Sequence, residues 1–108
     1  MRGTADVQAG VCLHRTAVTA ETSDGRAVNL ALETTCDNVR RLAALFDSAP
    51  ALDAYREINP KGESAVLAMG REAACCTDCI VPASALKALR VATGLALPAD
   101  AAIALAGE

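Results

Sequence analysis

Five cysteines are the residues of this 108-residue chain whose type and spacing could do chemistry. They stand at positions 12, 36, 75, 76 and 79, and His14 follows the first of them by two residues. An odd number of cysteines is a poor basis for a disulfide framework and instead favours reduced thiols, metal ligation or redox chemistry. Because thiolates and imidazoles are the ligands that zinc and iron–sulfur clusters take, these two cofactors are the candidates.

Residues 76–79 form a C-x-x-C motif, which serves zinc, iron–sulfur clusters and thiol redox chemistry alike. The chain has no second C-x-x-C to complete a zinc site made of two such motifs. An Ala-rich, helical segment precedes the motif, whereas a thioredoxin-like site follows a strand. A redox protein that uses Cys76 and Cys79, with Cys36 or Cys12 as the resolving thiol, therefore stays an alternative.

A β-hairpin is the first element that the sequence predicts. Residues 11–22 and 26–34 are rich in β-branched or alternating apolar residues, and an Asp-Gly turn separates them. Cys12 and His14 would share one strand face, because side chains of a strand alternate with a period of two. Antiparallel pairing about the turn then brings Cys12 close to Cys36, at the same end of the sheet.

Helical periodicity follows the hairpin and predicts an α+β layer fold, with the hairpin packed against three to four helices. The helices would begin near residue 37, after Pro50, near residue 63 and at Pro82. The apolar segment 101–106 would add a third edge strand or a terminal helical turn. The length fits a single domain, 1–108.

Cys36 and Cys79 each stand just before a predicted helix. The unpaired amides and the dipole of a helix N-terminus favour an anion there, so both thiolates should form readily. Arg40 and Arg41 are interpreted as a solvated face of the first helix. Cys75 is the cysteine that a site could most easily spare.

Composition excludes several classes of function. A net charge of −3 and only two aromatic residues argue against nucleic-acid binding, and no apolar run reaches the length of a membrane span. The first residues lack the apolar stretch of a signal peptide, which predicts a cytoplasmic protein. A single histidine, with no nucleophile elbow and no phosphate-binding loop, favours a binding protein over an enzyme.

The order of the cysteines resembles the scaffold domain on which iron–sulfur clusters are assembled. That family has one cysteine at the start of a hairpin, a second at a helix entry and a third before a late helix, which correspond here to Cys12, Cys36 and Cys79. His14 stands where the family has an acidic residue. The resemblance covers residues 10–93 and implies a cluster scaffold whose partners are proteins of cluster assembly.

Two segments depart from the scaffold family. Residues 37–41 replace its small, Ser-rich helix start, and residues 72–78 replace its chaperone-recognition stretch. Docking to a chaperone or to a cysteine desulfurase is therefore not implied. The chain also resembles small uncharacterised domains with a G-x-C motif and a late C-x-x-C-x-V-P, a pattern present here at residues 10–12 and 76–82.

The resulting prediction is a one-domain protein with a cysteine-ligated zinc ion or iron–sulfur cluster, acting in cluster assembly or metal delivery. The ligands would be Cys12, Cys36 and Cys79, with Cys76 or His14 as the fourth. Besides the redox alternative, the chain could be an interaction domain whose cysteines only pack in the core. Its Ala-rich helices could be buried within a monomer or in a homodimer.

Overall fold

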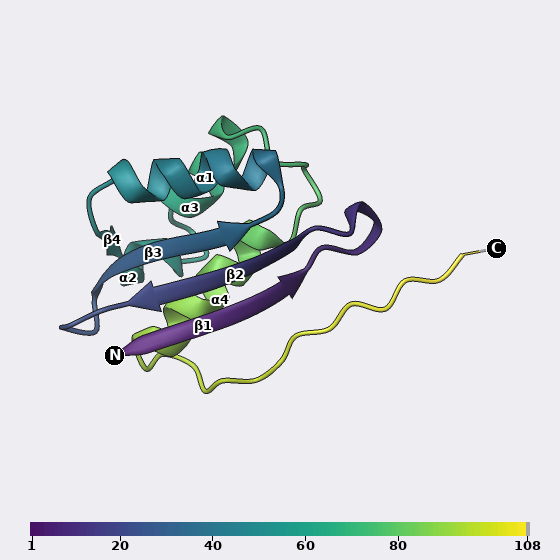
Figure 1. Cartoon of the computed structure of the whole chain (residues 1–108). Coiled ribbons are helices and arrows are strands. Elements are labelled where there is room, and N and C mark those ends of the chain that lie inside the picture. Colours follow the sequence, from purple (N-terminus) through teal and green to yellow (C-terminus); the bar gives the residue numbers. More distant parts are fainter. Residues whose placement is uncertain (108) are drawn as a thin grey trace.

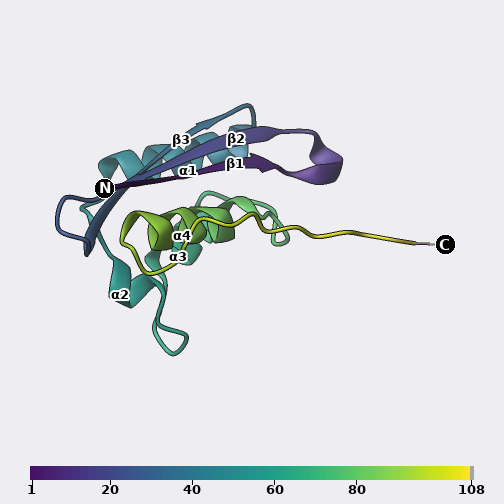
Figure 2. The same cartoon turned by 90° about the horizontal axis from the view of Figure 1, so that it is seen from below.

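The computed structural model describes residues 1–107, which form a four-stranded antiparallel sheet with order β1-β2-β3-β4 and four α-helices. Helices α3 and α4 lie on one side of the sheet, and no helix covers the opposite face in this part of the chain (Figures 1 and 2). The fold is therefore of the α+β class, as the periodicity predicted. The elements in chain order are β1 (Arg2–Gln8), a 3₁₀ turn (Gly10–Cys12), β2 (Arg15–Glu21), β3 (Ala27–Thr34), α1 (Asp37–Ser48), β4 (Leu52–Asp53), α2 (Ala54–Glu57), α3 (Ala65–Glu72) and α4 (Val81–Ala92).

The predicted hairpin is confirmed as β2 and β3, which pair from Thr16↔Thr34 to Glu21↔Asn29. The Asp24 carboxylate closes the turn by accepting hydrogen bonds from the backbone N–H of Arg26 at 2.8 Å and of Ala27 at 2.9 Å. Gly25 has φ +78°, a backbone conformation that residues other than glycine rarely adopt. The turn residues thus set the register, as the Asp-Gly signal indicated.

The third long strand lies at the N-terminus, where the residue pattern predicted none. Strand β1 pairs with β2 from Arg2↔Glu21 to Gln8↔Arg15. The prediction that residues 101–106 form an edge strand or a helical turn is wrong, because they are extended without pairing. The inward residues of β1 are Gly3, Ala5 and Val7, and two of them are too small to produce a clear hydrophobic alternation.

The helix predicted after Pro50 is only one turn long. Leu52 and Asp53 form the short strand β4 opposite Val28 and Ala27, and α2 follows directly. The N–H of Ala54 donates to the carbonyl oxygen of Arg26 at 2.9 Å. This pairing to β3 delays the start of the helix.

The core between the sheet and the helices is aliphatic. Helix α4 packs on β1 and β2, and α1 packs on β3. The largest fully buried side chains come from both layers and are Leu42, Leu89, Val18, Val28, Val66 and Val81. The remaining helix predictions, near residues 37, 63 and 82, are confirmed by α1, α3 and α4.

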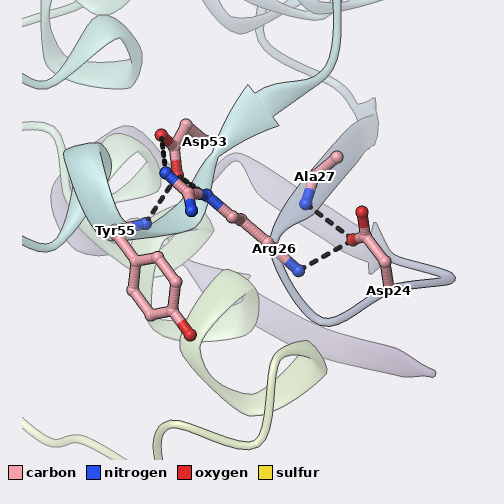
Figure 3. A network of polar contacts seen from close by, with 5 residues as sticks. All are labelled: Asp24, Arg26, Ala27, Asp53 and Tyr55. Carbon is pink, nitrogen blue, oxygen red and sulfur yellow. Dashed lines mark hydrogen bonds and ion pairs between the residues drawn. The ribbon is translucent and has the colours of Figure 1, made fainter.

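A polar network fastens β4 to the start of β3 at the end of the sheet that carries the β2–β3 turn (Figure 3). The Arg26 guanidinium donates to both carboxylate oxygens of Asp53 at 3.2 Å and lies 5.1 Å from the centre of the Tyr55 ring. The hydrogen bond from Arg26 lowers the pKa of Asp53, and the backbone N–H groups of Arg26 and Ala27 lower the pKa of Asp24.

This network predicts an acid-dependent loss of stability. A carboxyl group whose pKa is lower in the folded chain stabilises the fold above its unfolded pKa and loses that effect as the pH falls through the folded value. Asp53→Asn should therefore reduce the difference between urea midpoints measured at about pH 5 and about pH 3. Asp47→Asn, on an exposed position of α1, is the control and should keep the wild-type difference. An unchanged difference in Asp53→Asn would contradict the prediction.

Candidate functional site

All five cysteines lie in three segments that reach the end of the sheet opposite the polar network. Cys12 is in the 3₁₀ turn between β1 and β2, and Cys36 is the N-cap residue directly before α1. Cys75, Cys76 and Cys79 belong to the link between α3 and α4. Every one of them is a free thiol, and three are half-buried while Cys12 and Cys76 are exposed.

Hydrogen bonds at the end of β3 connect the first two of these segments. His14 Nδ1 is 3.0 Å from the Thr35 hydroxyl, which also accepts a hydrogen bond from the backbone N–H of Arg15 at 3.2 Å. The N–H of Thr35 in turn donates to the carbonyl oxygen of Arg15 at 3.2 Å. The expectation that the hairpin brings Cys12 and Cys36 to the same end of the sheet is confirmed, because Thr16 at the start of β2 pairs with Thr34 at the end of β3.

The placement of Cys12 and His14 on one strand is wrong. The strand begins only at Arg15, and the preceding residues turn because Gly10 has φ +83° and Leu13 has φ +61°. For a leucine this left-handed conformation is strained, and strain of this kind is concentrated at functional sites. Cys12 therefore lies in the loop between β1 and β2 and not on a strand with His14.

The end of α3 sets the direction of the cysteine-rich link. The N–H of Cys75 donates to the carbonyl oxygen of Gly70 at 3.1 Å, and the N–H of Ala74 donates to that of Arg71 at 3.0 Å. These two bonds form a Schellman motif, whose left-handed residue is usually glycine. Here it is Ala74 with φ +59°, so no glycine in the sequence marked this turn.

Cys76 and Cys79 lie in one β-turn, because the N–H of Cys79 donates to the carbonyl oxygen of Cys76 at 2.9 Å. Such a turn keeps its first and last α-carbons within about 7 Å. Two thiols at this separation can chelate one metal ion or form a disulfide. The geometry of the C-x-x-C motif thus agrees with either chemistry.

Cys75 connects the α3–α4 link to the start of α1. Its thiol donates to the carbonyl oxygen of Asn38 in the first turn of α1, with Sγ at 3.9 Å from that oxygen. Since α1 begins beside Cys36, this contact ties the α3–α4 link to the start of the helix. The adjacent C-x-x-C motif concealed this role, because it drew attention to the exposed Cys76 instead.

Arg41 is exposed on α1, as its interpretation as part of a solvated face predicted, and it also joins these two segments. Its Nε donates to the carbonyl oxygen of Ala73 at 3.0 Å, at the end of α3, and its guanidinium also binds the Asn38 side chain. Arg40 keeps to the surface, where it forms an ion pair with Asp37 at 2.6 Å.

The thiols influence one another electrostatically. Burial raises the pKa of Cys75, and the neighbouring thiols of Cys79, Cys36 and Cys76 raise it further. Burial also raises the pKa of Cys79, followed by Cys36, Cys76 and Cys12. These effects outweigh a backbone hydrogen bond at the start of α4 that lowers the pKa of Cys79. The expectation of a readily formed thiolate at Cys79 is therefore wrong for the metal-free chain.

Soft donors from three segments have the chemistry that zinc or an iron–sulfur cluster needs. Within residues 1–107, however, no three Cys, His, Asp or Glu side chains converge on a point where one metal ion could sit. The half-buried thiols would have to turn toward the β-turn of the C-x-x-C motif to bind an ion together. The structure thus gathers several donors, two of which share one β-turn.

The family comparison matches residues 3–105 to a family of unknown function, DUF6951. The chain belongs to the DUF6951 family. The part of it that matches DUF6951 includes every cysteine and also the extended segment after α4. No curated protein and no solved structure matches the chain. Among residues 1–107, none of the helices combines the length and apolar character that crossing a membrane requires.

Proposed function

We propose that this protein binds zinc or an iron–sulfur cluster through cysteine thiolates and acts in cluster assembly or metal delivery. The observation that carries the proposal is the gathering of the cysteines near the start of α1. The Cys75 thiol donates to the carbonyl oxygen of Asn38, two residues after Cys36, with Sγ at 3.9 Å from that oxygen, and Cys12 lies in the loop before β2. These cysteines come from three segments that are far apart in the sequence. Cysteines that only fill a core have no reason to gather in this way.

A bound cation would supply positive charge that stabilises the thiolates of this cluster. Burial and the neighbouring thiols raise the pKa of Cys75 and Cys79, and a bound metal ion would offset the repulsion between thiolates while protons are released. Cys76 and Cys79 would bind first because their β-turn holds them close together. Cys36 would complete the site from α1, with Cys12, Cys75 or His14 as the remaining ligand.

The resemblance to iron–sulfur scaffold domains supports the same proposal. Cys12 precedes the β2–β3 hairpin, Cys36 directly precedes a helix and Cys79 lies just before the late helix α4, in the order that the resemblance describes. Partners would then be proteins of cluster assembly. A cytoplasmic location is part of the proposal, because five free thiols are maintained in a reducing compartment.

The expected result is a metal site that depends on Cys36 and Cys79. Protein purified without oxygen should contain zinc, or iron with acid-labile sulfide, and both Cys36→Ser and Cys79→Ser should weaken binding at least about 100-fold. Affinity is measured by competition with a chelator, and the helical circular-dichroism signal confirms folding. Asp78→Asn, in the same turn, is the matched control and should keep the wild-type affinity.

Full metal content in both serine variants would overturn the proposal. The β-turn geometry of Cys76 and Cys79 favours one second candidate, a thiol redox protein. A reversible disulfide between these two residues by mass spectrometry, with no metal at any stage, would establish that function instead. Five titratable thiols with neither metal nor disulfide would leave an interaction domain whose cysteines have a packing role.

A further inference from the structure

Strand β1 has a free edge beside an open groove. Within residues 1–107 it pairs only with β2, so the backbone groups on its other side have no strand partner. The groove has a volume of about 910 Å³ and runs between Thr4–Gln8 of β1, one face of α4 and the segment Pro98–Ala102. An unpaired strand edge with a groove beside it is a template for another extended segment.

The groove is lined in part by apolar side chains that are incompletely buried. Ala5 of β1 and Ile80 before α4 pack against the buried core but are themselves only half-buried, and both line the groove. Val91 of α4 lines it as well and is also half-buried. An apolar strand laid in the groove would cover all three side chains and gain the free energy of their burial.

The chain carries an apolar segment of the matching kind after α4. Residues 97–107 have no regular secondary structure, and their side chains are exposed. Ile103 is 72% exposed and Leu105 is 92% exposed. Being two residues apart, they would lie on one face of a strand. The match to the family reaches residue 105, so this apolar segment is part of the family's domain.

The last part of this segment, residues 103–107, does not line the groove of its own chain. The tail runs beside β1 in the same direction and continues beyond the end of that strand (Figures 1 and 2). Residues 98–102 already form the outer wall of the groove, and the strand opposite them ends at Gln8. Ile103 and Leu105 therefore lie past the end of their own β1.

We propose that residues 103–107 enter the groove of a second copy of this chain, where they add to the free edge of β1. In a two-fold dimer each chain would donate its tail and receive the other, so one operation buries both apolar segments. The inference is independent of the thiol site and concerns a different surface. It identifies the occupant of the groove as the same segment of a second chain.

Analytical ultracentrifugation of the full chain tests the proposal. The wild-type protein should be a dimer over roughly 1 to 200 µM, and Ile103→Asp with Leu105→Asp should raise the dissociation constant at least about 100-fold. Both positions are exposed within the monomer, so the monomer should fold as before. Val11→Asp with Leu13→Asp makes the same change at two exposed positions of the β1–β2 loop and should leave the dimer intact.

Hydrogen exchange of the β1 amides distinguishes binding of the tail to a second chain from binding of the tail to its own chain. The amides of β1 should be protected in the wild-type dimer and lose protection in the tail variant or on dilution. A monomeric wild-type protein would overturn the proposal. Protection of β1 that does not depend on concentration would also overturn it, as would a dimer that survives the tail substitutions but not those in the loop.

Discussion

Replacement of Gly3 by alanine should lower the free energy of unfolding by about 3 kcal/mol. Gly3 lies in β1 directly against α4, where an added methyl carbon would be 2.2 Å from the carbonyl oxygen of Ala88 and 2.8 Å from the nitrogen of Ala92. These are backbone atoms of a helix and cannot rotate away, so the strand and the helix would have to separate. The buried layer between them would then lose contacts along β1.

The sign of this effect makes the test informative. Alanine in a strand is ordinarily more stable than glycine by about 0.5–1 kcal/mol, because the unfolded chain has less freedom. Urea denaturation of Gly3→Ala measures the change, and Ala17→Val is the control because it adds carbon atoms on the uncovered face of β2. The control should stay within about 0.5 kcal/mol of the wild type. If Gly3→Ala is as stable as the wild type, β1 does not lie this close to α4.

Replacement of Glu57 by alanine should cost about 3 kcal/mol, the second large effect. The Glu57 side chain is only 5% exposed and accepts hydrogen bonds from the first turn of α3. One carboxylate oxygen accepts from the Ser64 hydroxyl at 2.9 Å and from the Val66 N–H at 2.8 Å, and the other accepts from the Ala65 N–H at 2.9 Å. Alanine would leave these donors without a partner where water has little access.

The loss should come from the hydrogen bonds more than from the general attraction of a helix N-terminus for negative charge. Glu63 is also close to the start of α3 but is exposed, and Glu63→Ala should cost about 0.5 kcal/mol or less. Glu57→Gln keeps the volume and removes the charge, so its cost should lie between the two. Equal urea midpoints for Glu57→Ala and Glu63→Ala would show that the buried contacts contribute nothing beyond charge.

Both effects bear on the thiol site, because α3 and α4 flank the cysteine-rich link. Glu57 holds the beginning of α3, whose other end turns through Ala74 into Cys75. Gly3 allows β1 to seat α4, which begins two residues after Cys79. The two positions lie far along the chain from most of the cysteines, and they fix the elements that carry them.

The amino-acid sequence by itself determined the features that depend on local chemistry. The Asp-Gly turn set the β2–β3 hairpin, and a period of 3.6 in the apolar residues determined α1, α3 and α4. The meeting of Cys36 with the residues before β2 followed from the register of one hairpin, which needs only a turn position and antiparallel pairing.

Only the tertiary structure decided which residues form the edge strand β1, which connect the α3–α4 link to α1, and which polar side chains are buried. Strand β1 is built of small and polar residues with weak strand preference, and it forms because β2 pairs with it and α4 covers it. Cys75 turns toward α1 through a left-handed alanine, and Glu57 is buried because the start of α3 packs beside it. These outcomes depend on contacts between segments far apart in the chain, and periodicity and turn signals describe only neighbours along it.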